Sequence, residues 1–203
     1  MPTHASREPA ARIAPLHLAH ATMQEAMDAL REQRIAVCFE QAPLAPEEAT
    51  RLPDGSIEFA RARFDLALPA GPLPAALDAL TQADPTYRWE VAGAPPAYVV
   101  YPAAASALDW PVPPRRWAGL DWVAAVQSLD LAAHDVALFP RGLERQPRVP
   151  LDRFDPGPQN ARHWLTALVA FVDQGRYWNL AGVGAERTLV LGQVAPEAPP
   201  PGA

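Results

Sequence analysis

Apolar and polar residues follow two spacings along this chain, one typical of α-helices and the other of β-strands. Thr22 and Asn160 stand where two of the helices should begin, and Thr22 with Glu25 has the spacing of a capping box. The helical segment that Asn160 begins has the widest apolar face and is expected to be the most buried. Helical spacing, with apolar residues every three or four positions, appears in four segments: 23–33, 73–80, 119–131 and 161–173.

Short apolar or alternating runs between these segments are typical of strands. Together with the four helices they predict an α+β fold. The predicted strands are 16–18, 35–40, one or two within 57–68, 87–91, 98–101, 135–139, 149–154, 176–180 and 187–191.

The order of these elements repeats. The segments 87–93 and 177–182 are both short and aromatic, and each follows a helix and precedes another apolar strand. We therefore predict two tandem repeats, each a small mixed sheet packed against two helices. The predicted division is a disordered lead-in at 1–14, a first module at 15–102, a Pro/Ala-rich joint at 103–114, a second module at 115–194 and a disordered tail at 195–203.

Charge and hydropathy narrow the classes of function. The net charge is −6, all 17 basic residues are arginines, and no basic run exceeds two residues, so nucleic-acid binding is not expected. No apolar run approaches the roughly 20 residues that span a bilayer. The first 14 residues lack the apolar core of a secretory signal peptide, which leaves the compartment open.

No catalytic or metal-binding constellation is apparent. Cys38 is the only cysteine and, inside an apolar run, is expected to be a buried, inert thiol. His17 and His20 would point to opposite faces of a strand, so they should not share a metal ion. Asp152 and Asp155 are interpreted as solvated surface carboxylates. We expect no metal, no cofactor and no enzyme activity.

Aromatic residues are the more informative candidates. Trp122 and Trp164 are predicted to lie in the core. Trp110, Trp117 and Trp178 are near the joint or on a polar strand. They either line a groove for a peptide or a sugar or hold the two halves together, and we favour the second interpretation. The candidate binding residues are Trp110, Trp117, Trp178, Tyr87 and Trp89.

Two segments resemble the STN domain, the short N-terminal domain of secretins and TonB-dependent receptors. In that family an extended segment and a small-residue turn precede a Leu-x-x-Ala-Leu-x-x-Leu helix and a strand, and 64–80 is similar to this pattern, as is 21–30 to its helix. The resemblance covers about residues 16–101. It is weak over 117–194, where tryptophans replace the usual Leu and Ala, and no barrel or secretin core follows.

The STN resemblance implies small sheets packed on helices, an extracytoplasmic location, and protein–protein contact at an exposed sheet edge without catalytic residues. Our first hypothesis is a non-catalytic interaction or assembly module of a bacterial envelope system that binds a protein partner, by strand addition to a sheet edge. The alternative is a small-ligand, peptide or sugar receptor, or an enzyme, with an aromatic cleft between the halves. A structural spacer is the third possibility. Neither the partner nor the oligomeric state follows from the sequence.

Overall fold

The computed structural model describes residues 11–44, 49–51, 53, 57–93, 95–114, 117–139, 148–173, 175–183 and 186–194. Within these residues the chain forms four α-helices, a 3-10 helix and several sheets. The fold is therefore mixed α+β, as predicted. The predicted disordered tail at 195–203 and residues 1–10 of the predicted lead-in lie outside the described residues. The prediction is wrong for the end of the lead-in, because Arg12–Ile13 form a strand and Ile13 is buried.

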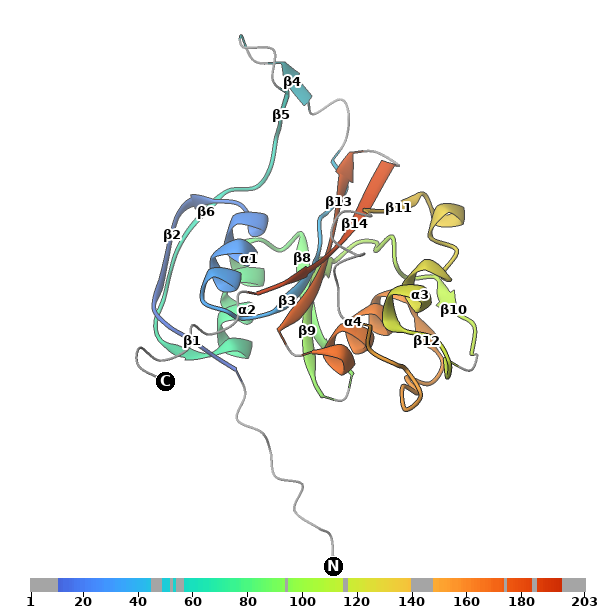
Figure 1. Ribbon diagram of the computed structural model, residues 1–203. Helices are drawn as coiled ribbons and strands as arrows, with labels where there is room; N and C mark the ends of the chain where they lie inside the picture. The colour runs from blue at the N-terminus through green and yellow to red at the C-terminus, as the bar shows by residue number, and fades with distance from the viewer. Residues whose placement is uncertain are drawn as a thin grey trace, which may run out of the picture.

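A six-stranded sheet forms the centre of the molecule (Figure 1). In spatial order its strands are β11 (Val136–Leu138), β14 (Glu186–Gln193), β13 (Arg176–Val183), β3 (Val37–Glu40), β9 (Ala97–Pro102) and β8 (Tyr87–Ala92). The pairs β13–β14 and β8–β9 are antiparallel, whereas β11–β14, β13–β3 and β3–β9 are parallel.

This sheet is continuous across the two halves of the chain. Strands β3, β8 and β9 come from the first half, β11, β13 and β14 from the second, and the parallel pairing of β3 with β13 joins them. The expectation of one small sheet in each half is wrong in this respect. Each three-stranded half leaves unpaired backbone groups at its edges, and pairing β3 with β13 satisfies those on one edge of each.

Helices cover both faces of the sheet (Figure 1). Helices α1 (Met23–Glu32) and α2 (Leu73–Ala83) lie on one face, and α3 (Trp122–Gln127) and α4 (Ala161–Val172) on the other. Alternate residues of β3 enter the two cores: Val37 and Phe39 pack toward α1 and α2, and Cys38 packs toward α3 and α4. None of the described helices is long and apolar enough to cross a membrane.

Side-chain caps determine where the helices begin. Thr22 and Glu25 form the predicted capping box, with the Thr22 amide 2.7 Å from the Glu25 carboxylate. Asn160 Oδ1 accepts the His163 amide at 2.9 Å, which confirms the predicted cap of α4. The segment predicted as a helix at 119–131 is shorter. Asp121 caps α3, which ends at Gln127, and a separate 3-10 helix, η2 (Leu131–His134), follows.

Four two-stranded ribbons flank these layers. The predicted strand at 149–154 is reduced to a single bridge between Asp121 and Pro150. Strand β10 (Pro111–Val112) lies inside the predicted joint, so this part of 103–114 belongs to the fold. The ribbons are β1 (Arg12–Ile13) with β7 (Gly71–Pro72), β2 (Leu16–Ala21) with β6 (Phe64–Leu68), β4 (Ala49–Arg51) with β5 (Ile57–Phe59), and β10 (Pro111–Val112) with β12 (Gln159–Asn160).

A stacked contact fixes α1 against the second half of the sheet. The Arg31 guanidinium lies 4.1 Å from the centre of the Tyr177 ring, and its Nη1 also bonds Asp28. Tyr177 stands opposite Gly192 on the neighbouring strand β14. A Cβ atom at Gly192 would come within 2.4 Å of the Tyr177 ring. Glycine at this position therefore leaves the space that the ring occupies.

We expect Gly192→Ala to destabilise the protein by about 1–3 kcal/mol, because the new methyl group must displace a ring held by Arg31. Urea unfolding followed by circular dichroism measures the change. Gly71→Ala is the matched control, since its Cβ would meet only Pro69 O, at 3.8 Å, and its effect should stay within about 1 kcal/mol. Equal stability of the two variants would show that Tyr177 is not confined by this contact.

Candidate functional site

Strand β8 is an edge strand of the central sheet. Among the described residues it pairs with β9 alone. The Ala103 amide donates to the Thr86 carbonyl at 2.8 Å. In an antiparallel ladder this puts the even-numbered residues of β8 in hydrogen-bonded pairs with β9. The N–H and C=O groups of Trp89 and Val91 therefore point away from β9.

The side chains of this edge are partly apolar. Val91 is 48% exposed, the highest value among the described large hydrophobic residues. Trp89 is half-buried, and its indole N–H donates to Asp78 Oδ1 at 2.9 Å. The Tyr98 ring lies 6.1 Å from Trp89. Within the described part of the chain, the edge thus presents unpaired backbone groups beside an exposed valine and a fixed tryptophan.

A polar network holds the opposite side of β8 against α4. Glu90 Oε1 accepts the Arg162 Nε–H at 2.8 Å and lies 2.6 Å from His163 Nε2. The Tyr101 hydroxyl donates to Glu90 Oε2 at 2.9 Å. The Arg162 guanidinium lies over the Tyr101 ring and also bonds Asp109.

These contacts change the proton affinity of both charged partners. Burial alone would raise the pKa of Glu90, but its hydrogen bonds and the charge of Arg162 outweigh that effect and lower it. Burial would likewise lower the pKa of Arg162, and Glu90 and Asp109 raise it instead. Both groups are thus charged at neutral pH, and the network fixes β8 while leaving its outer edge open.

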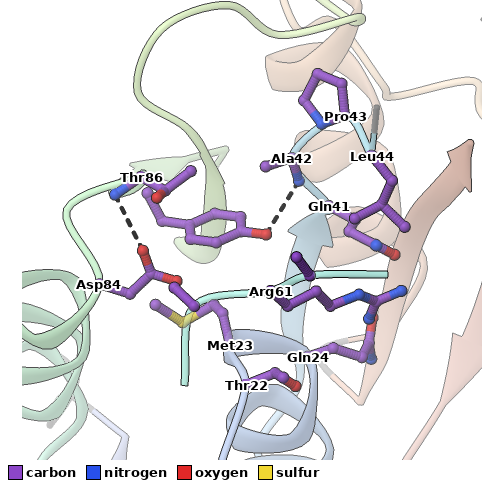
Figure 2. A pocket seen from close by; sticks show the side chains of 13 residues that line it. Thr22, Met23, Gln24, Gln41, Ala42, Pro43, Leu44, Arg61, Asp84 and Thr86 are labelled. Carbon is purple, nitrogen blue, oxygen red and sulfur yellow. Dashed lines mark hydrogen bonds between the residues drawn. The ribbon is translucent and has the colours of Figure 1, made fainter. Parts of the chain in front are cut away.

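A pocket of about 260 Å³ lies at the N-terminal end of α1 (Figure 2). Tyr87, the first residue of β8, contributes to its wall, and its hydroxyl accepts the Ala42 amide at 3.0 Å. Burial raises the pKa of Tyr87, so the phenol keeps its proton at neutral pH. The pocket is lined by Thr22, Met23, Gln24, Gln41, Ala42, Pro43, Leu44, Ala60, Arg61, Ala62, Asp84, Thr86 and Tyr87.

The five predicted aromatic residues fall into two groups. Tyr87 and Trp89 pack on the α1–α2 side of the sheet. Trp117 and Trp178 are buried on the other side, and Trp110 is half-buried against them. The structure therefore does not gather all five at one place.

Each tryptophan on the α3–α4 side has a defined packing partner. The Trp178 indole N–H donates to Thr166 Oγ1 at 3.1 Å. Trp117 packs on Trp164 with ring centres 4.6 Å apart, and Trp110 stacks on His134 at 4.1 Å. The cavity beside Trp117 is about 40 Å³, little more than a water molecule occupies.

The other candidates for reactive chemistry are the Cys38 thiol and groups of potential metal ligands. Cys38 is buried, as predicted, and desolvation raises the pKa of its thiol to about 12. No cluster of three or more potential metal ligands occurs among the described residues.

A buried carboxylate that the sequence analysis missed lies where the halves meet. Glu40, at the end of β3, is fully buried. Its oxygens accept the Ser106 hydroxyl at 2.5 Å, the Ala107 amide at 2.6 Å and Arg187 Nη1 at 3.2 Å. The signal in the sequence was an acidic residue at the end of an otherwise apolar strand. These bonds tie β3, the turn after β9 and β14 together.

Comparison with known proteins assigns no family: no protein-family model matches the chain, and no curated protein or solved structure matches it significantly.

Glu40 should make stability depend on pH. Desolvation raises the pKa of its carboxyl above the ordinary value despite the bonds from Ser106, Ala107 and Arg187. The folded state then holds this proton more tightly than the unfolded chain, so stability falls as pH rises from about 4.3, the usual value of glutamate, through the raised pKa. Glu40→Gln should remove this part of the dependence.

Urea unfolding of the protein and of Glu40→Gln at several pH values between 4 and 8 measures the difference. Glu186→Gln, at an exposed position near Arg187, is the control and should keep the wild-type profile. A Glu40→Gln profile parallel to the wild-type profile over this range would contradict the assignment.

Proposed function

We propose that this protein is a non-catalytic interaction module that binds a protein partner by adding the partner's strand to β8. The observation that carries the proposal is the outer edge of β8, which pairs with no other described strand. There Trp89 and Val91 direct backbone groups away from β9, and Val91 is the most exposed large hydrophobic residue of the part that the structure describes. Such an edge takes an extended segment through main-chain hydrogen bonds.

Matching hydrogen bonds in the two halves support the predicted repeat as part of this proposal. After α2, Asp84 Oδ1 accepts the amide two residues on, at 3.1 Å, and after α4 Asp173 Oδ1 does the same at 2.9 Å. The amides of Tyr87 and Arg176 then donate to the carbonyls of Asp84 and Asp173. By this correspondence β8 matches β13, and Trp89 matches Trp178.

The order of strands agrees with the same correspondence. In the first half β3 pairs in parallel with β9, and β9 pairs antiparallel with β8. In the second half β11 pairs in parallel with β14, and β14 antiparallel with β13. A residue with positive φ precedes both β3 and β11: Arg34, three positions before β3, at 64°, and Asp135, directly before β11, at 56°.

The matched strand β13 provides an internal example of the proposed binding mode. Its outer edge is occupied by β3, which runs parallel to it, and the Gln41 amide donates to the Leu180 carbonyl at 2.8 Å. In the matched numbering Leu180 corresponds to Val91. The position that β3 fills next to β13 is thus the position left open next to β8.

The other end of the sheet is less suited to strand addition. Strand β11 has three residues against six in β8. Pro140 follows Phe139 in the sequence and has no N–H group to donate. The bacterial envelope setting and the relationship to STN domains rest on the sequence resemblance and belong to this proposal.

Photo-crosslinking in the native host tests the proposal. A benzoylphenylalanine at position 91 should give a discrete adduct with one partner protein, identified by mass spectrometry. The same probe at position 190 should not, because Val190 is also exposed but lies on β14, which is paired on both sides. Val91→Asp should abolish the complex, whereas Val190→Asp should preserve it.

Hydrogen exchange on the isolated complex decides whether the contact is strand addition. The amides of Trp89 and Val91 should exchange at least about tenfold more slowly when the partner is bound, since new backbone bonds protect them. Unchanged exchange at both amides in a complex that forms normally would refute strand addition at β8.

A further inference from the structure

We propose that the pocket at the N-terminal end of α1 binds a short zwitterionic peptide, with the peptide's ammonium group at Asp84 and its carboxylate at Arg61 and Gln41. This inference does not depend on strand addition at β8. It rests on a cavity with opposite charges on its two sides and on the buried Gln41 Nε2, which has no hydrogen-bond partner among the described residues. In Figure 2, Asp84 lies at one side of the pocket, and Arg61 and Gln41 lie at the other.

Asp84 lies in the pocket wall and has one carboxylate oxygen that no described residue binds. The residue as a whole is 4% exposed, and Oδ1 accepts the Thr86 amide at 3.1 Å. Among the described residues, no hydrogen bond reaches Oδ2. A carboxylate removed from water costs free energy unless a cation or donors pair with it. A ligand ammonium group, with three N–H donors, would supply that partner.

In the second half of the chain, the corresponding carboxylate has a hydrogen-bond donor for its second oxygen. Asp173, which caps α4 as Asp84 caps α2, also uses Oδ1 for the amide two residues on. Its Oδ2 accepts the Gln193 side-chain amide at 2.8 Å. Gln193 lies opposite Arg176, the first residue of β13. The residue opposite Tyr87, the first residue of β8, is Pro102. Proline has no side-chain donor, so Asp84 Oδ2 stays open.

The opposite side of the pocket holds donors. Gln41 is 6% exposed, and its Nε2 is buried without a hydrogen-bond partner in the part of the chain that the structure describes. The Arg61 guanidinium lies on the same side (Figure 2). A carboxylate can accept from both groups, and it is the anion whose geometry suits an arginine.

Two further features favour a carboxylate on this side. The first-turn amides of α1, at Met23 and Gln24, have no acceptor within the helix, and this end of the helix carries positive partial charge. The Tyr87 hydroxyl, which keeps its own proton, is an additional donor.

Size and apolar walls set the class of ligand. A cavity of about 260 Å³ is near the lower end of the range for small-molecule pockets and suits two or three residues of peptide. Met23, Pro43, Leu44, Ala60 and Ala62 line it and would contact an aliphatic side chain. Because the two charged ends lie on opposite sides, both termini of the peptide contribute to binding.

Isothermal titration calorimetry with the dipeptide alanyl-leucine tests this inference on the full chain. We expect saturable binding of the free dipeptide. N-acetyl-alanyl-leucine and alanyl-leucinamide should each bind at least about tenfold more weakly, because each lacks one charged terminus. No binding of the free dipeptide at millimolar concentration, or equal binding of all three peptides, would overturn the proposal.

Two pocket variants test which residue binds each charged end of the peptide. Asp84→Asn keeps the Oδ1 acceptor for the Thr86 amide and should weaken alanyl-leucine at least about tenfold while leaving N-acetyl-alanyl-leucine unchanged. Arg61→Gln should weaken the binding of alanyl-leucine at least about tenfold while leaving the binding of alanyl-leucinamide unchanged. Asp130→Asn and Arg153→Gln, both at exposed positions away from the pocket, are matched controls and should bind like the wild type. Wild-type affinity in both pocket variants would refute the assigned roles.

Discussion

The parallel pairing of β3 with β13 is the constraint on which the rest of the structure depends. Phe39 and Glu40 pair with Asn179 and Leu180, and the Gln41 amide extends the ladder to the Leu180 carbonyl. This short contact turns two three-stranded units into one sheet. It also forces Glu40 out of water, and Ser106, Ala107 and Arg187 must then satisfy the buried carboxylate.

The direction of this pairing explains why helices cover both faces. Strand β13 runs parallel to β3, whereas β8 runs antiparallel to it. If β8 and β13 are matched strands, the second half is turned over relative to the first, while its strands keep the same order along the sheet. Helices α3 and α4 then come to lie on the face opposite α1 and α2, and neither pair leaves a broad apolar surface of the sheet exposed.

Local signals in the sequence predicted much of this fold, because caps and apolar spacing act over a few residues. Thr22 and Asn160 begin their helices as expected, and Cys38 is buried. The single sheet could not be predicted in the same way, since no local pattern records that Phe39 pairs with a strand 140 positions later. The third helix was misjudged because its apolar spacing continues past Gln127, where the chain changes to a 3-10 helix.

The candidate site was less accessible to sequence reasoning, and the reason lies in differences between the halves. The sequence indicated Tyr87 as a candidate binding residue because it is aromatic. Asp84 and Gln41 become candidates only when their neighbours in space are known. Gln193 binds the second carboxylate oxygen of Asp173, and β3 pairs with the outer edge of β13. In the first half Pro102 offers no such donor to Asp84, and among the described residues β8 pairs with β9 alone. Both incomplete positions belong to the first half. The proposed strand addition at β8 and the proposed peptide site therefore both use positions at which the first half differs from the second.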